Sequence, residues 1–432
     1  MSEAPEQPGS SDPAQFGFQV TERLPGGLGR AGVISTPHGE IHTPAFVVVG
    51  TKATVKAVLP ESVAQLGAQA VLANALHLYL QPGSDLVDEA GGLGAFMNWP
   101  GPTFTDSGGF QVMSLGVGFK KVLAMDVTGL QDDDVIAEGK QRQAHVDDDG
   151  VWFTSPINGD RHRFTPEVSM RVQHELGADI TFAFDELTTL FNTRQYQEAS
   201  VARTQAWAQR CLAAHRELAR QRPHRPYQAL FGVVQGAHYE DLRRTACRGL
   251  VATEVDGQHF DGYGIGGALE KRRLGEIVGW CSQELPDDRP RHLLGISEPD
   301  DLFAAIAAGA DTFDCVNPSR VARNAAIYTA HGRYNVNTAA NRRAFVALED
   351  DCDCYTCTHY TRAYLHHLFK AKEMLASTLA TIHNERFTVR LVDTIRAAIA
   401  AGDFEACRTE VLGQFYGPLA QIGLGATRVD NR

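Results

Sequence analysis

Acidic side chains follow three apolar segments of this sequence. Asp106 lies in TFTDS, Asp185 in ITFAFD and Asp314 in DTFDCV. A carboxylate beside a buried apolar segment is costly unless it is used or paired. Two carboxylates that face one anomeric carbon can act as nucleophile and general acid/base in glycosyl transfer with retained configuration. A third can accept hydrogen bonds from a ligand, although a single acid here can equally be a helix N-cap.

Small and planar residues lie beside these acids. Asp106 continues into the run Ser-Gly-Gly-Phe, and the segments FGVVQGAHY and YGIGGALE contribute Gln235, Gly266 and Gly267. Glycines allow a flat ligand to approach the backbone, Gln235 can both donate and accept, and Phe110 could stack on a ring. Taken alone, Ser-Gly-Gly is equally consistent with an ordinary turn.

Three cysteines occur within six residues, as Cys352, Cys354 and Cys357 in DCDCYTC. Three thiolates need a fourth ligand to close a tetrahedral zinc site, and four protein ligands make such a site structural. The alternatives are a chance cluster, or one disulfide with a free thiol. The spacing ranks His383 first as the fourth ligand and His367 second; the other two candidates are His359 and His366.

Eight short apolar segments alternate with helical patterns and position the acids. They span 45–50, 70–74, 103–107, 180–185, 228–235, 260–267, 291–296 and 311–316. Continuous apolar runs suit strands buried on both faces of a parallel sheet. An open doubly wound sheet is the alternative. Because nearly every segment ends on a chemically useful group, we predict an α/β fold of the (β/α)8, or TIM, barrel type, whose strand ends converge.

The domain organisation follows from composition. We expect a disordered tail at 1–15, a catalytic barrel at 16–350 with an insertion around 116–150 and a small antiparallel ribbon, and a zinc-binding subdomain with C-terminal helices at 351–432.

The chain of 432 residues has a net charge of −12, so a polyanion would need a local basic patch. From Arg320 to Lys372 there are eight Lys/Arg and four Asp/Glu. No signal peptide or membrane-spanning run is present, and the scattered cysteines suit a reduced, cytoplasmic protein.

The ordered set TDSGGFQ, FDE, VVQG, IGG, FDCV-NPSR, C-x-C-x-x-C and a distal HN resembles the bacterial tRNA-guanine transglycosylase family, also called queuine tRNA-ribosyltransferases. The resemblance extends from about Phe16 to the C-terminus. It implies exchange of guanine at wobble position 34 of tRNAs with G-U-N anticodons (Asp, Asn, His, Tyr) for a 7-deazaguanine. The reaction passes through a covalent enzyme–RNA intermediate and serves queuosine biosynthesis.

The resemblance also implies roles for individual residues. Asp314 corresponds to the nucleophile and Asp106 to the general acid/base. The base pocket would comprise Ser107, Gly108, Gly109, Phe110, Asp185, Gln235, Gly267 and Ala268. The RNA-binding segments would comprise Gly295, Ile296, Ser297, Glu298, Pro299, Asp300 and Asp301, with Ser319, Arg320, Val321, Ala322 and Arg323. One structural Zn²⁺ per subunit would be bound by Cys352, Cys354, Cys357 and His383. A homodimer would use Phe96, Tyr360, Tyr364 and His367.

Three departures from the usual family pattern concern the base. Phe110 stands where Tyr is usual, Leu187 where Cys is usual, and GGALEKR replaces the usual Gly-Gly-Leu-Ala-Val-Gly-Glu loop, with Glu270 nearest to the displaced acid. The base is therefore preQ1 or, alternatively, queuine. Two other functions remain as alternatives. One is a non-catalytic RNA-binding partner subunit of the same fold, and the other is a metal-dependent hydrolase, for which only His77 lies near a strand end.

Overall fold

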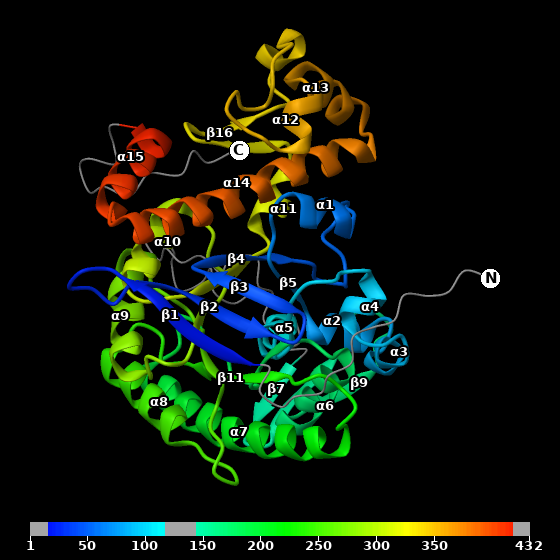
Figure 1. Ribbon diagram of the computed structural model, residues 1–432. Helices are drawn as coiled ribbons and strands as arrows, with labels where there is room; N and C mark the ends of the chain where they lie inside the picture. The colour runs from blue at the N-terminus through cyan, green and yellow to red at the C-terminus, as the bar shows by residue number, and fades with distance from the viewer. Residues whose placement is uncertain (1–15, 117–143, 418–432) are drawn as a thin grey trace.

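The centre of the molecule is a closed barrel of eight parallel strands (Figure 1). The computed structural model describes residues 16–116 and 144–417. The barrel strands are β4 (Ala45–Val49), β5 (Val71–Ala73), β6 (Thr103–Thr105), β10 (Ile180–Phe182), β11 (Ala229–Val234), β12 (Gly262–Ile265), β13 (Arg291–Leu293) and β14 (Thr312–Cys315). Each lies in one of the eight segments expected from the sequence, and β14 pairs with β4 to close the barrel. The predicted barrel is confirmed.

Side chains along each strand alternate between the barrel interior and the outer core, and both environments are apolar. This explains why the strand segments appear in the sequence as continuous apolar runs. Val47 and Val49 of β4 belong to a core cluster that fills the barrel interior, together with Phe104 of β6 and Phe182 of β10. Phe46, by contrast, faces the outer core between strands and helices. Because both faces are covered, polar residues are tolerated mainly where a strand ends.

The described residues form fifteen α-helices, which cover the barrel or belong to a separate lobe. They are α1 (Pro60–Gln65), α2 (Ala75–Leu80), α3 (Ser84–Glu89), α4 (Leu93–Met97), α5 (Gly109–Gly116), α6 (Pro166–Leu176), α7 (Arg194–Gln221), α8 (Glu240–Ala252), α9 (Leu274–Glu284), α10 (Pro299–Ala307), α11 (Asn317–Ala322), α12 (Tyr355–His359), α13 (Arg362–Ala371), α14 (Met374–Ala401) and α15 (Phe404–Tyr416). Sequence signals set their ends. The hydroxyl of Thr165 caps α6 by accepting from the Val168 N–H, and the helix stops at Gly177, where φ is +67°. No helix of the described residues is long and apolar enough to cross a membrane.

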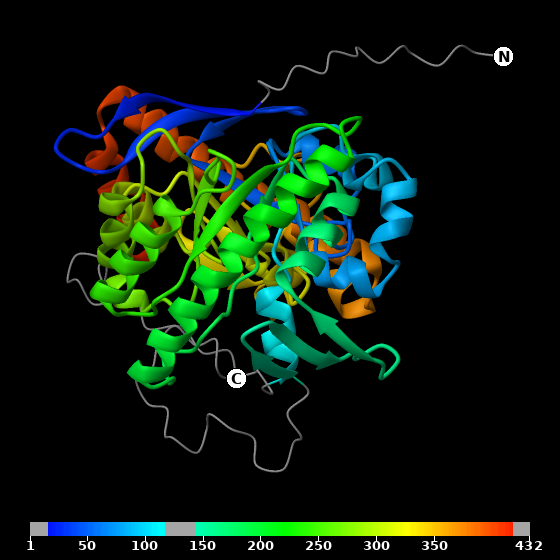
Figure 2. The same cartoon turned by 90° about the horizontal axis from the view of Figure 1, so that it is seen from below.

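Two antiparallel sheets lie at opposite ends of the barrel (Figure 2). The first comprises β1 (Gly17–Arg23), β2 (Arg30–Thr36) and β3 (Gly39–Thr43). The second comprises β7 (Ala144–Asp147), β8 (Gly150–Thr154) and β9 (Arg161–Phe164), which lie between β6 and β10 in the chain. This is where the sequence suggested an antiparallel ribbon. The expected tail at 1–15, most of the insertion at 116–150, and residues 418–432 lie outside the described residues.

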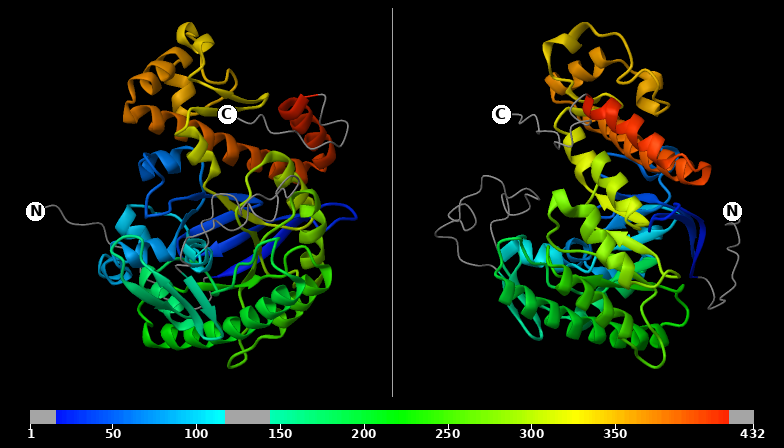
Figure 3. Two further views of the ribbon diagram at one scale, coloured as in Figure 1. Left: turned by 180° about the vertical axis from the view of Figure 1, so that it is seen from behind. Right: turned by 90° about the vertical axis from the view of Figure 1, so that its left-hand side faces the viewer.

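A separate lobe lies on the far side of α14 from the barrel (Figure 3). It contains the hairpin of β15 (Ala326–Thr329) and β16 (Gly332–Asn335) together with α12 and α13. We call this the cysteine lobe. Since α14 also contacts β4, this one helix joins the lobe to the barrel.

A buried carboxylate ties the first antiparallel sheet to the barrel. Asp179, just before β10, accepts hydrogen bonds from the Thr103 N–H at 2.8 Å and lies 2.7 Å from Nδ1 of His38 in the β2–β3 turn. Asp179 is almost fully buried. This hydrogen bond and the negative charge of Asp179 raise the pKa of His38, although burial lowers it.

We predict that this pair makes stability depend on pH. Because the pKa of His38 is raised in the folded state, its charge contributes stability that is fully present below the unfolded pKa of about 6.5 and is lost as pH rises through the folded pKa. The melting temperature of wild type should therefore exceed that of His38→Asn by more at pH 6 than at pH 8.5. A difference that stays constant across this range would contradict the assignment.

Candidate active site and metal centre

Polar side chains converge at the carboxyl end of the closed barrel. Asp106 follows β6 directly, Gln235 follows β11, and Asp314 lies within β14. Asp185 lies three residues beyond the end of β10. In such a barrel all of these strand ends face one mouth, where active sites are built. The sequence-predicted acids are thus brought to one end of the fold.

Asp106 lies in a pocket of hydrogen-bond donors. Its carboxylate accepts from the side-chain amide of Asn74, from the Ala75 N–H at 2.8 Å, and from Nε2 of Gln111 at 2.6 Å. Burial raises the pKa of Asp106 to about 6, the three donors oppose this rise, and the negative charge of Asp314 adds to it. A carboxyl group with a pKa near neutrality can both give and take a proton.

Asp185 is held by two neighbouring strand ends. Its carboxylate accepts from Oγ of Ser107 at 2.9 Å and from Nε2 of Gln235 at 2.6 Å. It is buried, and burial raises its pKa while both donors oppose the rise. The two hydrogen bonds join the segments that follow β6, β10 and β11 into one polar wall.

Glycines allow this wall to be flat. A Cβ on Gly109 would lie 2.5 Å from the Asp185 carbonyl oxygen, and one on Gly267 would lie 2.5 Å from Oε1 of Gln235. Gly267 also has a φ of +87°, a backbone conformation that other residues rarely adopt. Gly108 is likewise left-handed, at +82°. The exposed ring of Phe110 follows directly, with 39% of its surface accessible.

Asp314 has an asymmetric environment. Its Oδ1 accepts a hydrogen bond from the Gly295 N–H at 3.2 Å and lies 3.1 Å from Nε2 of His292. The carboxylate is partly exposed, with 15% of its side chain accessible. Gly295 follows β13, the strand between β12 and β14, so the backbone at one strand end supports the acid of the next.

Sequence reasoning assigned no role to three side chains that contact the two acids: Asn74, which it noted only as the polar end of a strand, Gln111 and His292. Asn74 ends an apolar strand, which was a usable signal. His292 lies within the apolar segment RHLLGI, where no spacing rule marks it. Gln111 gave no signal of its own, because its side chain reaches Asp106 only through the first turn of α5.

The segments expected to contact RNA lie at the same end. Residues 295–301 lead from β13 into α10, and residues 319–323 include most of α11. Many of their side chains are buried and can only support the backbone: Ile296, Ser297, Pro299, Asp301, Ser319 and Ala322. Arg320 is exposed, whereas Arg323 donates to the Ser319 carbonyl at 2.8 Å.

The acids of the first segment are already paired. Glu298 accepts from Arg333 of β16 at 2.7 Å, and Asp300 accepts from the hydroxyl of Tyr416 at 2.6 Å. Lys271, in the loop after β12, lies 3.4 Å from carboxylate oxygens of Asp300 and Asp301. These contacts offset part of the negative charge of the acids and tie the β12 loop to the start of α10.

The cysteine lobe brings together three thiols and one imidazole. Sγ atoms of Cys352, Cys354 and Cys357 lie 3.6, 3.6 and 3.3 Å from Nδ1 of His383, and all four ligand atoms lie within 4.8 Å of one another. All four residues are buried. Nε2 of His383 lies 2.7 Å from the carbonyl of Tyr328, which fixes the ring so that Nδ1 faces the thiols.

These four residues fit a tetrahedral metal ion. With bonds of about 2.3 Å to sulfur and 2.0–2.1 Å to nitrogen, the ligand atoms of such a site are separated by roughly 3.5 Å. The other three candidates lie outside the group: His367, ranked second, is exposed on α13, His359 is exposed and bonds to the Tyr355 carbonyl, and Nδ1 of His366 lies 2.9 Å from the Val336 carbonyl. Each of the four residues therefore supplies one ligand atom.

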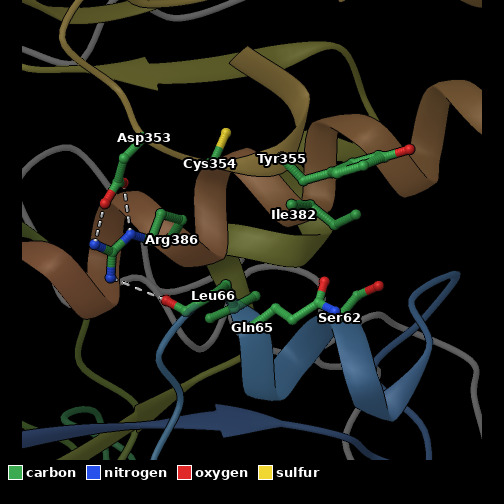
Figure 4. Close-up of a pocket in the computed structure, with 8 residues that line it drawn as sticks. All are labelled: Ser62, Gln65, Leu66, Asp353, Cys354, Tyr355, Ile382 and Arg386. Atoms are coloured by element: carbon green, nitrogen blue, oxygen red, sulfur yellow. Dashed lines mark hydrogen bonds and ion pairs between the residues drawn. The ribbon is translucent and has the colours of Figure 1, made fainter. Parts of the chain in front are cut away.

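A cavity of about 130 Å³ separates the cysteine lobe from α1 (Figure 4). Across it, Arg386 of α14 forms two hydrogen bonds with Asp353, at 2.8 and 2.6 Å, and donates to the Leu66 carbonyl at 3.1 Å. Asp353 lies between two of the cysteines. One arginine thus fastens the metal-ligand loop both to α14 and to the barrel.

Fold and site together define a class: a (β/α)8-barrel enzyme with carboxylates at its mouth and a separate Cys3His group that could hold a metal ion. The chain belongs to the queuine tRNA-ribosyltransferase family, whose sequence model matches residues 26–417. Proteins named queuine tRNA-ribosyltransferase from Symbiobacterium thermophilum, Pelotomaculum thermopropionicum and Roseiflexus sp. are 43%, 42% and 44% identical to it. These alignments cover 92%, 93% and 92% of this chain and 91%, 99% and 99% of the relatives.

We predict that Cys354→Ser loses the metal centre. Replacing one of three thiolates leaves an incomplete ligand set, so metal content should fall from about one ion per chain to well below half. Metal analysis of the purified variant measures this. Cys407→Ser is the matched control, because Cys407 is only half-buried and outside the group. Normal metal content in Cys354→Ser would contradict the site.

Proposed function

We propose that this protein is a tRNA-guanine transglycosylase that exchanges guanine at the wobble position of tRNAs with G-U-N anticodons for a 7-deazaguanine. The observation that carries the proposal is the convergence of two differently solvated carboxylates, Asp106 and Asp314, beside a flat polar wall. Membership of the queuine tRNA-ribosyltransferase family supports it.

Asp314 is the nucleophile in the first half-reaction. A carboxylate oxygen of Asp314 bonds to C1′ of the nucleotide as the bond from C1′ to N9 of guanine breaks. The electron pair of that bond leaves with the base, which takes up the proton held by Asp106. A pKa of about 6 keeps roughly a tenth of Asp106 protonated at pH 7, far more than an ordinary aspartate, so burial equips this residue to act as the acid.

The second half-reaction reverses these steps with a different base. N9 of the incoming 7-deazaguanine attacks C1′, its proton passes to Asp106, and the ester to Asp314 breaks with return of the electron pair to the carboxylate. Two successive displacements at C1′ retain configuration.

The polar wall reads the base. Guanine-like rings present N–H donors on one edge, and Asp185, already oriented by Ser107 and Gln235, is placed to accept them. The backbone of Gly267 and Ala268 can approach the ring because Gly267 carries no side chain. Phe110 offers an exposed face for stacking. The base is preQ1 or queuine; the β12 loop that would meet its 7-substituent is tied down through Lys271.

The RNA is held around this mouth by basic groups. Arg320 is exposed beside Asp314 in sequence, and the stretch from Arg320 to Lys372 is basic on an acidic body. An anticodon loop is single-stranded, so its wobble base can be splayed into a pocket. Contacts to its phosphates make binding weaken with salt.

The Cys3His group holds one structural Zn²⁺, because four protein ligands leave no open position for a reaction. We place this centre in a subdomain of residues 351–432 that braces the RNA-binding side of a cytoplasmic enzyme.

A homodimer forms through exposed aromatic groups. Tyr360 and Tyr364 stack at 5.5 Å in the cysteine lobe, with His367 beside them, and Phe96 is exposed on α4.

Two alternatives are less well supported. A non-catalytic RNA-binding subunit has no need for a buried acid at Asp106 opposite Asp314. A metal-dependent hydrolase needs metal ligands at the barrel mouth. Among the described residues, the Cys3His group is the one cluster suited to a metal, and it lies in the cysteine lobe.

We predict that the purified protein incorporates labelled preQ1 or queuine into a tRNA with a G-U-N anticodon, and exchanges labelled guanine. Asp314→Asn should lose exchange by at least about 100-fold, because an amide oxygen is a poor nucleophile. Glu298→Gln, a change of the same size among the paired acids nearby, should lose far less. Full exchange by Asp314→Asn, or incorporation of none of the three bases by wild type, would contradict the proposal.

A further inference from the structure

A buried histidine lies directly beneath the nucleophile. His292 on β13 is fully buried in the barrel interior, with ring centroids 5.6 Å from Phe104 and 5.1 Å from Phe182. Its Nε2 lies 3.1 Å from Oδ1 of Asp314, and its Nδ1 lies 2.9 Å from Oγ1 of Thr312. The two aromatic rings leave the imidazole little room to turn, so both contacts are fixed.

The partners of the imidazole determine which nitrogen carries the proton. An ionised carboxylate can only accept hydrogen bonds, so Nε2 must donate to Asp314. In neutral histidine Nδ1 is then the acceptor, and the hydroxyl of Thr312 can serve as its donor. Thr312 and Asp314 lie two residues apart on β14 and therefore share one face of the sheet, the face of His292, which pairs with Thr312 in register.

The second donor to the same oxygen is backbone. The Gly295 N–H reaches Oδ1 at 3.2 Å, from a residue with a φ of +80°. Within residues 16–116 and 144–417, no hydrogen bond is formed to Oδ2 of Asp314. Oδ1 is thus held by two donors, whereas Oδ2 accepts none from the described residues, and 15% of the Asp314 side chain is accessible.

We propose that His292 is a positioning residue that reserves Oδ2 of Asp314 for attack and stabilises the carboxylate when it departs. This inference rests on the proposed transglycosylase function. In the first half-reaction Oδ2 bonds to C1′, the C1′–N9 bond breaks with its electron pair going to guanine, and the proton comes from Asp106. Oδ1 then becomes the carbonyl oxygen of a neutral ester, still facing His292 and Gly295.

The two donors favour the free carboxylate over the ester. A hydrogen bond to an ionised acceptor is about twice as strong as one to a neutral acceptor. When the incoming base attacks C1′ and the ester breaks, the electron pair returns to the carboxylate and its charge is shared with Oδ1. His292 therefore makes Asp314 a better leaving group, and its removal should make the covalent adduct accumulate.

The test measures the equilibrium between adduct and free guanine. Wild type and variants are incubated with tRNA carrying a G-U-N anticodon, and the adduct is quantified on denaturing gels against added guanine. In His292→Leu, the guanine concentration that halves the adduct should rise by about 10-fold or more, in line with the loss of one charged hydrogen bond. Turnover in base exchange should fall at the same time.

Further variants separate this role from a structural one. His292→Gln keeps a side-chain N–H donor and should restore most of the wild-type guanine dependence. Thr312→Val removes the hydroxyl that fixes the tautomer of His292. It should raise the midpoint, which is the guanine concentration that halves the adduct, as His292→Leu does but by a smaller factor. His42 is an exposed histidine on β3 at the opposite end of the barrel, so His42→Leu should leave the midpoint unchanged.

Three outcomes would overturn the inference. They are an unchanged midpoint in a folded His292→Leu, a shift in His292→Gln as large as that in His292→Leu, or, should His292→Leu fail to fold, an unchanged midpoint in Thr312→Val. Absence of any adduct in wild type would instead contradict the proposed function. The two failures are therefore distinguishable.

Discussion

Asp106 and Asp185 lie at the mouth of a closed barrel, where water solvates them poorly. The other residues of the site compensate for this lost solvation with hydrogen-bond donors. Desolvation is the leading cause that raises the pKa of each acid. The structure supplies donors in compensation: Asn74, Ala75 and Gln111 for one acid, and Ser107 with Gln235 for the other. The balance leaves one carboxyl poised near neutrality and the other oriented along a flat wall.

Closure of the sheet brings these groups together. In an open sheet the ends of β6 and β14 would be separated along an edge, whereas in the barrel only β4 and β5 lie between them, and Asp314 adds its charge to the environment of Asp106. The metal centre lies away from these acids, joined to the barrel through α14 and Arg386. The carboxylates at the barrel mouth and the Cys3His group therefore lie in different parts of the chain.

The sequence was sufficient to predict the barrel and the location of the acids at its mouth, because burial leaves a clear pattern. Strands covered on both faces appear as apolar runs, and a polar residue that ends such a run is conspicuous, as with Asp106 and Asp185. The cysteine spacing similarly limited the fourth metal ligand to a few histidines. His292 could not be found in this way, because its partners, Thr312 and Asp314, are adjacent only through pairing of β13 with β14.

The segments expected to contact RNA show a second limit of sequence reasoning. Composition identified a basic stretch, but pairing decides which groups are available: Arg333 is engaged by Glu298, whereas Arg320 is exposed. Such pairing depends on contacts between β16, α10 and α11 that no local pattern encodes.

The central claim is that Asp314 forms a covalent bond to the tRNA while Asp106 only transfers protons. Peptide mapping by mass spectrometry tests it most directly, after the enzyme–tRNA adduct has been trapped and digested with ribonuclease and protease. We expect a nucleotide remnant on the peptide containing Asp314 and none on the peptide containing Asp106. A remnant on Asp106 or Asp185, or an adduct that persists in Asp314→Asn, would contradict it.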